Sequence, residues 1–124
     1  MNDNDGLIVS GLTDEQRAVV YHPGGHARVS AVAGSGKTTT MVARIGKLLS
    51  DGIPAERIMV LMFNRSARDG FVRTMEVRLK ELGCPLPEIR TFHSLGARLV
   101  ESFTRKGVLP SFRLETRDSV IEKL

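Results

Sequence analysis

The sequence predicts an α/β fold in three layers with parallel strands, and three observations lead to this prediction. Apolar runs typical of buried strands alternate with segments of 3.6-residue helical periodicity. A glycine-rich segment joins the first apolar run to the first long helix. The 124 residues are 41% hydrophobic and 26% charged, which suffices for one domain with a core. Alternation of this kind favours parallel strands covered by helices.

Two helices and one strand are predicted in the N-terminal half. Thr13 and Gln16 form a capping-box pattern, so a short helix should begin at Asp14, after a flexible segment at residues 1–10. Residues 27–32, "ARVSAV", are predicted to form a buried strand. The next helix should present one apolar face to the core, formed by Met41, Val42, Ile45, Leu48 and Leu49.

Strands and helices continue to alternate in the second half. Residues 58–63, "IMVLMF", form a continuous apolar run, typical of a strand covered on both faces. A helix ending at Gly83, a strand at residues 88–92 and a helix from His93 should follow. Their inward faces would comprise Ala67, Phe71, Met75, Leu79 and Leu82 in the first helix and Leu95, Leu99 and Phe103 in the second. A further capped helix is predicted at Thr116, and because the sequence stops within it, we expect a truncated protein.

Charge and cysteine content narrow the class of protein. The net charge is +4, with five basic against six acidic residues in 1–56 and thirteen against eight in 57–124. This asymmetry predicts a polyanionic partner for the second half, or else a solvated basic surface. Cys84 is the only cysteine, which excludes an intrachain disulfide and a Cys-rich zinc site and fits a cytoplasmic protein. No run reaches the roughly 18 apolar residues of a membrane helix, and the acidic N-terminus is no secretory signal.

The segment "AGSGKTTT" carries the strongest chemical signal. Gly34 and Gly36 let the backbone approach an anion closely, and the following helix points its N-terminus at the same place. Lys37 adds a positive charge for terminal phosphates, and Thr38 offers a hydroxyl to Mg²⁺ bound by those phosphates. The pattern predicts a nucleoside triphosphate site, although Ala31 stands where the general P-loop pattern has its first glycine. The alternative is a glycine-rich connection with a chance lysine.

Four segments in order resemble one family. "AVAGSGKT" resembles motif I of UvrD/Rep/PcrA-type superfamily 1 DNA helicases, in which an alanine replaces the first glycine. "GLTDEQRAVV" resembles the Q motif of that family, "VLMFNRSARDGFVRTM" its motif Ia, and "RTFHSLGARLV" its motif Ib. The resemblance covers roughly residues 10–124. It implies a RecA-like P-loop fold, the use of ATP with Mg²⁺, and single-stranded DNA as a partner.

The resemblance assigns nucleotide contacts to Gln16, Ala33, Gly34, Ser35, Gly36, Lys37, Thr38 and Thr39. Gln16 would recognise the adenine through its carboxamide. The same side chain could instead serve only the capping box, and we expect that it cannot do both at once. Thr38 would be the Mg²⁺ contact, through ATP. Thr39 stands where many members have an arginine, so its contact with the base is an open point.

The resemblance assigns contacts with single-stranded DNA to Phe63, Asn64, Arg65, Thr91 and His93. Phe63 would provide a stacking platform, unless it packs in the core of an otherwise apolar strand. Arg65 would bind phosphate, or be a solvated residue at a helix start. Thr91 and His93 would contact the DNA backbone, although His93 could simply be a hydrogen-bonding residue at a helix N-terminus. The P-loop and both DNA-contacting segments follow strand ends, the edge at which α/β proteins bind ligands.

Other parts of an ATP-driven motor are missing from the sequence. Hydrolysis needs a carboxylate that positions Mg²⁺, one that activates water, and arginines that stabilise the transition state. No apolar run here ends in a carboxylate pair. We therefore interpret residues 1–124 as the N-terminal fragment of a helicase motor domain, expected to bind ATP or ADP without hydrolysing it. DNA repair is one expected setting.

Two alternatives stay open. A recombination helicase–nuclease would share these motifs and add a nuclease domain further along the chain. A stand-alone P-loop ATP-binding protein or small kinase should show the leading glycine and an arginine-rich lid, so Ala31 and the "TFHS" segment argue against it. A pure DNA-binding module would leave the P-loop unexplained.

Overall fold

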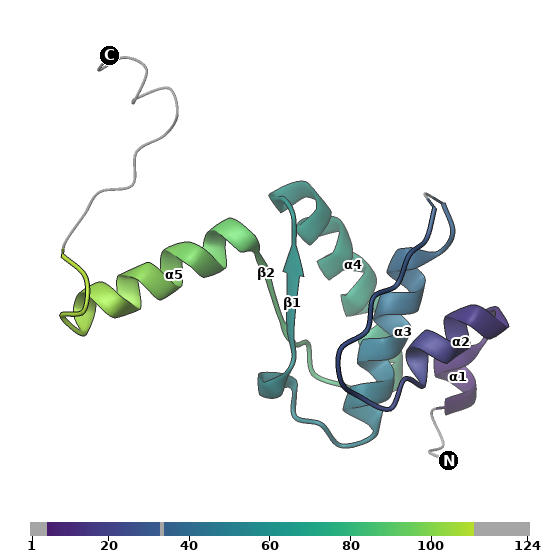
Figure 1. Ribbon diagram of the computed structural model, residues 1–124. Helices are drawn as coiled ribbons and strands as arrows, with labels where there is room; N and C mark the ends of the chain where they lie inside the picture. The colour runs from purple at the N-terminus through teal and green to yellow at the C-terminus, as the bar shows by residue number, and fades with distance from the viewer. Residues whose placement is uncertain (1–4, 33, 111–124) are drawn as a thin grey trace. The chain divides into compact units, whose positions relative to one another are not determined.

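The computed structural model describes residues 5–32 and 34–110 (Figure 1). In chain order the elements are α1 (Asp5–Val9), α2 (Asp14–Val20), α3 (Lys37–Ser50), a 3₁₀ turn η1 (Ala55–Arg57), β1 (Met59–Met62), α4 (Arg65–Leu82), β2 (Glu88–Thr91) and α5 (Phe92–Arg105). The chain divides into two compact units, residues 1–92 and 93–124, and each is considered by itself. The helix predicted at Thr116 lies outside the described residues.

The sheet consists of two parallel strands, which confirms the parallel arrangement in a mixed α/β fold. β1 pairs with β2 in a register that places Met59 opposite Glu88 and Met62 opposite Thr91. α4 connects the two strands, as a parallel crossover requires. The predicted continuous burial of β1 is not observed, because Met59 is exposed and the other strand residues are only half-buried.

The main core lies between α3, α4 and β2. Six buried residues form it: Val42, Ile45, Phe71, Met75, Leu79 and Ile89. The α4 residues recur every four positions, so the predicted apolar face of this helix is confirmed for Phe71, Met75 and Leu79. Gly83 ends α4 in the left-handed conformation, with φ of 67°.

A smaller core cluster lies at the N-terminal end of the chain. α1 occupies residues 5–9, where the sequence analysis expected a flexible segment, and its Ile8 is buried. Ile8 packs with Leu12, Val20 and Ala43, which joins α1 and α2 to α3. The helix predicted from Asp14 is confirmed as α2, with Thr13 as its N-cap and both halves of the capping box present. α1 is too short to leave a clear period in the sequence.

The prediction of a strand at residues 27–32 is wrong, because these residues form no strand. Val29 and Val32 are 57% and 78% exposed, although their sequence is typical of a buried strand. A strand forms only when its backbone groups pair with a neighbour. Among the described residues, β1 and β2 pair only with each other, so this segment is paired with neither strand.

α5 is an amphipathic helix whose apolar face is uncovered within the part of the chain that the structure describes. None of its residues is buried, and Leu99 and Phe103 are exposed. The sequence analysis placed Leu95, Leu99 and Phe103 in the core, so that prediction is wrong for the last two, while Leu95 is half-buried. The periodicity correctly predicts a helix, but periodicity alone does not supply the surface that would cover it.

A network of charges anchors the C-terminal half of α3. Lys47 donates to Asp5 of α1 at 3.1 Å and to Asp51 at 2.8 Å, and its ammonium lies 5.4 Å from the centre of the Tyr21 ring. The hydrogen bond that Lys47 donates to Asp51 contributes most to raising the pKa of Lys47 above its ordinary value of 10.5. The hydrogen bond to Asp5 also raises this pKa, whereas burial opposes both. The network therefore connects α1, α2 and α3 through one ammonium group.

Candidate functional site

The N-terminus of α3 is the centre of the candidate site. Gly36 is its N-cap, with φ of 84°, a left-handed conformation that glycine adopts readily. Among the described residues, no side chain caps this end. The first backbone N–H groups of a helix have no acceptor within it, and they carry the positive end of the helix dipole. Lys37, Thr38 and Thr39 form this first turn and are exposed. An anion can therefore approach both the backbone N–H groups and the Lys37 ammonium.

The loop before α3 is closed by hydrogen bonds to one carbonyl. The Ser35 backbone N–H and the Ser35 hydroxyl both donate to the carbonyl oxygen of Val32, at 3.2 Å and 2.6 Å. Gly34 lies within this turn, with φ of 76°, so the turn needs a residue that tolerates the left-handed region. Ala33, a predicted nucleotide contact, lies outside the described residues. The turn places Ser35 and Gly36 at the entrance to the helix.

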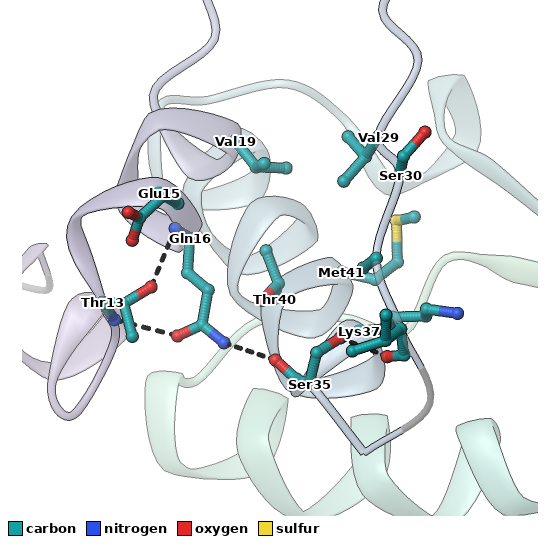
Figure 2. A pocket seen from close by; sticks show the side chains of 12 residues that line it. Thr13, Glu15, Gln16, Val19, Val29, Ser30, Ser35, Lys37, Thr40 and Met41 are labelled. Atoms are coloured by element: carbon teal, nitrogen blue, oxygen red, sulfur yellow. Dashed lines mark hydrogen bonds between the residues drawn. The ribbon is translucent and has the colours of Figure 1, made fainter.

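Gln16 connects α2 to this loop. Its Oε1 accepts from the Thr13 backbone N–H at 2.9 Å, and its own backbone N–H donates to the Thr13 hydroxyl at 3.2 Å. Its Nε2 donates to the Ser35 carbonyl oxygen at 2.9 Å (Figure 2). The capping role predicted from the sequence is thus confirmed, while the contact with adenine stays a prediction. The oxygen of a carboxamide has two lone pairs and its nitrogen has two N–H groups. The bonds to Thr13 and Ser35 therefore leave one lone pair and one N–H of Gln16 for a further partner, so capping does not preclude contact with a ligand.

A pocket of about 520 Å³ lies beside the loop (Figure 2). This volume falls in the range of roughly 300–1,000 Å³ that is typical of ligand sites. The lining residues come from α2, the segment before the loop, the loop itself and α3: Thr13, Glu15, Gln16, Val19, Val29, Ser30, Ala31, Val32, Ser35, Lys37, Thr40 and Met41. Apolar side chains thus stand next to a lysine and a carboxamide, a combination that suits a ligand with a flat apolar part and an anionic part.

The structure brings together only some of the predicted nucleotide contacts. Gln16, Ser35 and Lys37 line the pocket, whereas Thr38 and Thr39 share the exposed first turn of α3 without lining it. The sequence analysis missed the apolar lining. It assigned Met41 to the core face of α3, but Met41 is 48% exposed and lines the pocket. No sequence pattern indicated that Val19 lines the pocket, because this position depends on where α2 packs.

Phe63 is the most exposed large hydrophobic residue of the described chain. It follows the last residue of β1 and is 87% exposed, so the alternative that it packs in the core is wrong. Asn64 is the N-cap of α4, and its side chain accepts from the Ala67 backbone N–H at 2.8 Å. Arg65 is exposed and begins α4. An aromatic ring and a guanidinium therefore lie exposed to solvent two residues apart.

The end of β2 lies next to the end of β1. Thr91 is paired in register with Met62, so it lies on the strand beside the residue that precedes Phe63. Phe92 follows Thr91 and is 59% exposed. The sequence analysis did not single out Phe92, although its place in the "TFHS" segment at a strand end was a usable signal. His93 is exposed and belongs to the second unit.

The family comparison matches almost the whole chain. The UvrD/REP helicase N-terminal domain matches residues 12–124. This chain belongs to the UvrD/REP helicase family. The resemblance in the four sequence motifs is thereby confirmed, and membership of the UvrD/REP family implies a RecA-like fold and the use of ATP. Of that fold, the described residues show a mixed α/β arrangement with two parallel strands.

Relatives of this UvrD/REP chain include two proteins whose names describe them as subunits of an ATP-dependent helicase/nuclease. The one from Exiguobacterium sibiricum is 31% identical, and the match covers 82% of this chain and 10% of the relative. The one from Staphylococcus aureus strain MRSA252 is also 31% identical, and the match covers 90% of this chain and 11% of the relative. The chain thus spans about a tenth of the length of these relatives. In residues 5–32 and 34–110, no helix has both the length and the apolar character needed to cross a membrane.

Proposed function

We propose that this chain binds Mg·ATP at the N-terminus of α3 and forms part of an ATP-driven motor that moves on single-stranded DNA. The observation that carries the proposal is the juxtaposition of the uncapped α3 N-terminus, the exposed Lys37 and a pocket with apolar walls. Membership of the UvrD/REP helicase family supports ATP as the ligand.

The residues fit a nucleoside triphosphate by their chemistry. The backbone N–H groups of the α3 first turn and the Lys37 ammonium suit the phosphates, and Val19 and Met41 suit the faces of a base. A Cβ at Gly36 would lie 2.6 Å from Gln16 Nε2, so a larger residue here would displace the Gln16 carboxamide from the loop. Mg²⁺, which would offset the phosphate charge, has the Thr38 hydroxyl as its proposed protein contact.

Calorimetry with Mg·ATP tests the nucleotide site. Wild type should bind saturably, and Lys37→Ala should lose about 1.5–3 kcal/mol from the charge-assisted bonds, which is roughly one to two decades in Kd. Arg57→Ala is a suitable control, because Arg57 is exposed and lies in η1, away from the pocket lining. Equal ATP affinities for wild type and Lys37→Ala would contradict the assignment.

For DNA, we propose contacts at the adjoining ends of β1 and β2, through Phe63, Asn64, Arg65 and Thr91. In the second unit, considered by itself, we propose His93 as a separate DNA contact. The exposure of Phe63 supports a stacking role, since a base can stack on an aromatic ring that the protein leaves uncovered. Phe92 joins the proposal because it is a second exposed ring at the next strand end. Asn64 retains its amide N–H groups for DNA while its oxygen caps α4.

Fluorescence anisotropy with a labelled oligothymidine across a salt series separates the DNA contacts. Arg65→Ala should weaken binding and flatten the log–log salt slope by about 0.7, because one phosphate contact is lost. Phe63→Ala should weaken binding with little change in slope, because stacking at about 1–3 kcal/mol per base releases no counterions. Val77→Ala, an exposed apolar residue of α4, is the matched control. If Phe63→Ala binds like Val77→Ala, the stacking role is refuted.

A second candidate concerns the protein to which this chain belongs. The names of the two helicase/nuclease relatives favour a helicase that is combined with a nuclease. The full-length gene product should then degrade labelled DNA in the presence of Mg²⁺ and ATP. Lys37→Ala in the full-length protein should stop ATP-dependent unwinding while leaving a separate nuclease centre intact. A full-length product that unwinds DNA but never cleaves it would favour a helicase without nuclease activity.

A further inference from the structure

The Gln16 carboxamide is held at both ends by backbone groups from different parts of the chain. Its Oε1 is fixed by the Thr13 N–H, and its Nε2 donates to the carbonyl oxygen of Ser35, nineteen residues further along. The capping box thus sets the orientation of a side chain that reaches the phosphate-binding loop. A side chain used for capping alone would need only the contacts with Thr13.

The contact between Gln16 and the loop is close and depends on the residue that follows Ser35. A Cβ placed on Gly36 would lie 2.6 Å from Gln16 Nε2 and 3.8 Å from its Cδ. The first distance is shorter than an ordinary contact, so the carboxamide can occupy this position only because residue 36 is glycine. The left-handed φ of Gly36 is the second reason for glycine at this position.

Peptide geometry links the Ser35 carbonyl to the direction of the next N–H. The described residues contain no cis peptide bond. In a trans peptide the C=O and N–H of one unit point in opposite directions. A bond that holds the Ser35 carbonyl toward Gln16 therefore aims the Gly36 N–H away from Gln16. The Ser35 bonds to Val32 hold the N–H and the hydroxyl of the same residue, so Ser35 is held on both sides of its Cα.

We propose that Gln16 is a positioning residue for the phosphate-binding loop: by holding the Ser35 carbonyl, it orients the Gly36 N–H toward the phosphates. The inference rests on the proposed nucleotide site and deepens it. Gln16 contributes to affinity for the triphosphate tail itself, independently of any contact with the base. The carboxamide still has a lone pair and an N–H that can meet the base, so one side chain can couple the two ends of the nucleotide.

A ligand without a base separates this role from adenine recognition. Inorganic tripolyphosphate with Mg²⁺ is titrated into wild type, Gln16→Met and the control variant Arg57→Ala. Methionine is neutral and of similar length, but it cannot donate to Ser35. Gln16→Met should bind tripolyphosphate about 3- to 10-fold more weakly, the effect of one hydrogen bond. Arg57→Ala changes an exposed residue outside the pocket lining and leaves the Gln16–Ser35 bond in place, so its affinity should stay within about 2-fold of wild type.

A spectroscopic readout follows the loop directly. In wild type the Gly36 amide resonance should shift on addition of tripolyphosphate, and in Gln16→Met that shift should shrink while the α4 resonances remain unchanged. Thermal melts of both variants report any general loss of structure. A variant Gln16→Met that binds tripolyphosphate as wild type does but binds ATP more weakly would overturn the proposal, because Gln16 would then act on the base alone. Wild type that binds neither ligand would instead refute the proposed nucleotide site.

Discussion

The two ends of α3 each carry a lysine, and the surroundings of the two lysines are opposite. Lys47, near the C-terminal end, has a side chain that is 13% exposed, and it pairs with Asp5 and Asp51. Lys37, at the N-terminal end, is exposed and has no ion pair among the residues that the structure describes. Both charges lie on one helix, yet only one is used to hold the fold together.

The helix dipole makes this difference informative. A cation is favoured at a helix C-terminus and disfavoured at an N-terminus, so Lys47 is placed where the helix stabilises it and Lys37 where it does not. A charged residue that lowers the stability of the fold and has no ion-pair partner in it is expected at a functional site. The comparison therefore separates a lysine that serves the structure from one that is available to an external anion.

The largest expected effect is on nucleotide affinity at the N-terminal end. Lys37→Met should weaken Mg·ATP binding by roughly one to two decades, while its free energy of unfolding stays within about 0.5 kcal/mol of wild type. Calorimetry gives the first quantity and urea unfolding the second. A large loss of stability in Lys37→Met would contradict this difference between the two lysines, because Lys37 would then stabilise the fold as Lys47 does.

The next effect is on stability at the C-terminal end. Lys47→Met should lower the free energy of unfolding by about 1–3 kcal/mol, since Asp5, with a side chain that is 4% exposed, loses its cationic partner. Mg·ATP affinity should change little. Lys80→Met, an exposed lysine of α4, is the control. Adding Asp5→Asn to Lys47→Met should restore part of the loss, and additive effects would show that the pair is not coupled.

A smaller effect should follow from pH. Because the folded-state pKa of Lys47 is raised, its contribution to stability is fully present below the ordinary value of 10.5 and is lost as pH rises through the higher folded-state value. The stability difference between wild type and Lys47→Met should thus be constant from about pH 8 to 10 and shrink above about 10.5. Urea unfolding of both proteins across this range measures it. A stability difference between wild type and Lys47→Met that grows as the pH becomes more alkaline would contradict the predicted direction.

The smallest effect concerns the ring beside Lys47. Tyr21→Leu should lower the free energy of unfolding by about 0.5–1 kcal/mol, the value of an exposed cation–π contact. In the Lys47→Met background the same change should cost less, because no ammonium remains over the ring. Urea unfolding of the four proteins in this double-mutant cycle tests the contact, and equal costs in both backgrounds would assign the effect to packing alone.

Features that depend on a few neighbouring residues could be predicted from the sequence alone. The capping box of Thr13 and Gln16, the glycine entrance to α3, and the apolar face of α4 depend on residues close together along the chain, so their patterns predicted the observed elements. The family motifs likewise lie in short segments. The candidate anion site at Lys37 could therefore be located from the sequence.

Which apolar and polar groups have partners depends on the tertiary structure. It left residues 27–32 unpaired with either strand, placed Met41 in a pocket wall and exposed Phe63. It also joined Gln16 to Ser35 and Lys47 to Asp5, contacts between residues 19 and 42 positions apart. The physical reason is that burial and hydrogen bonding depend on which distant segment packs nearby, and a local pattern carries no information about that segment.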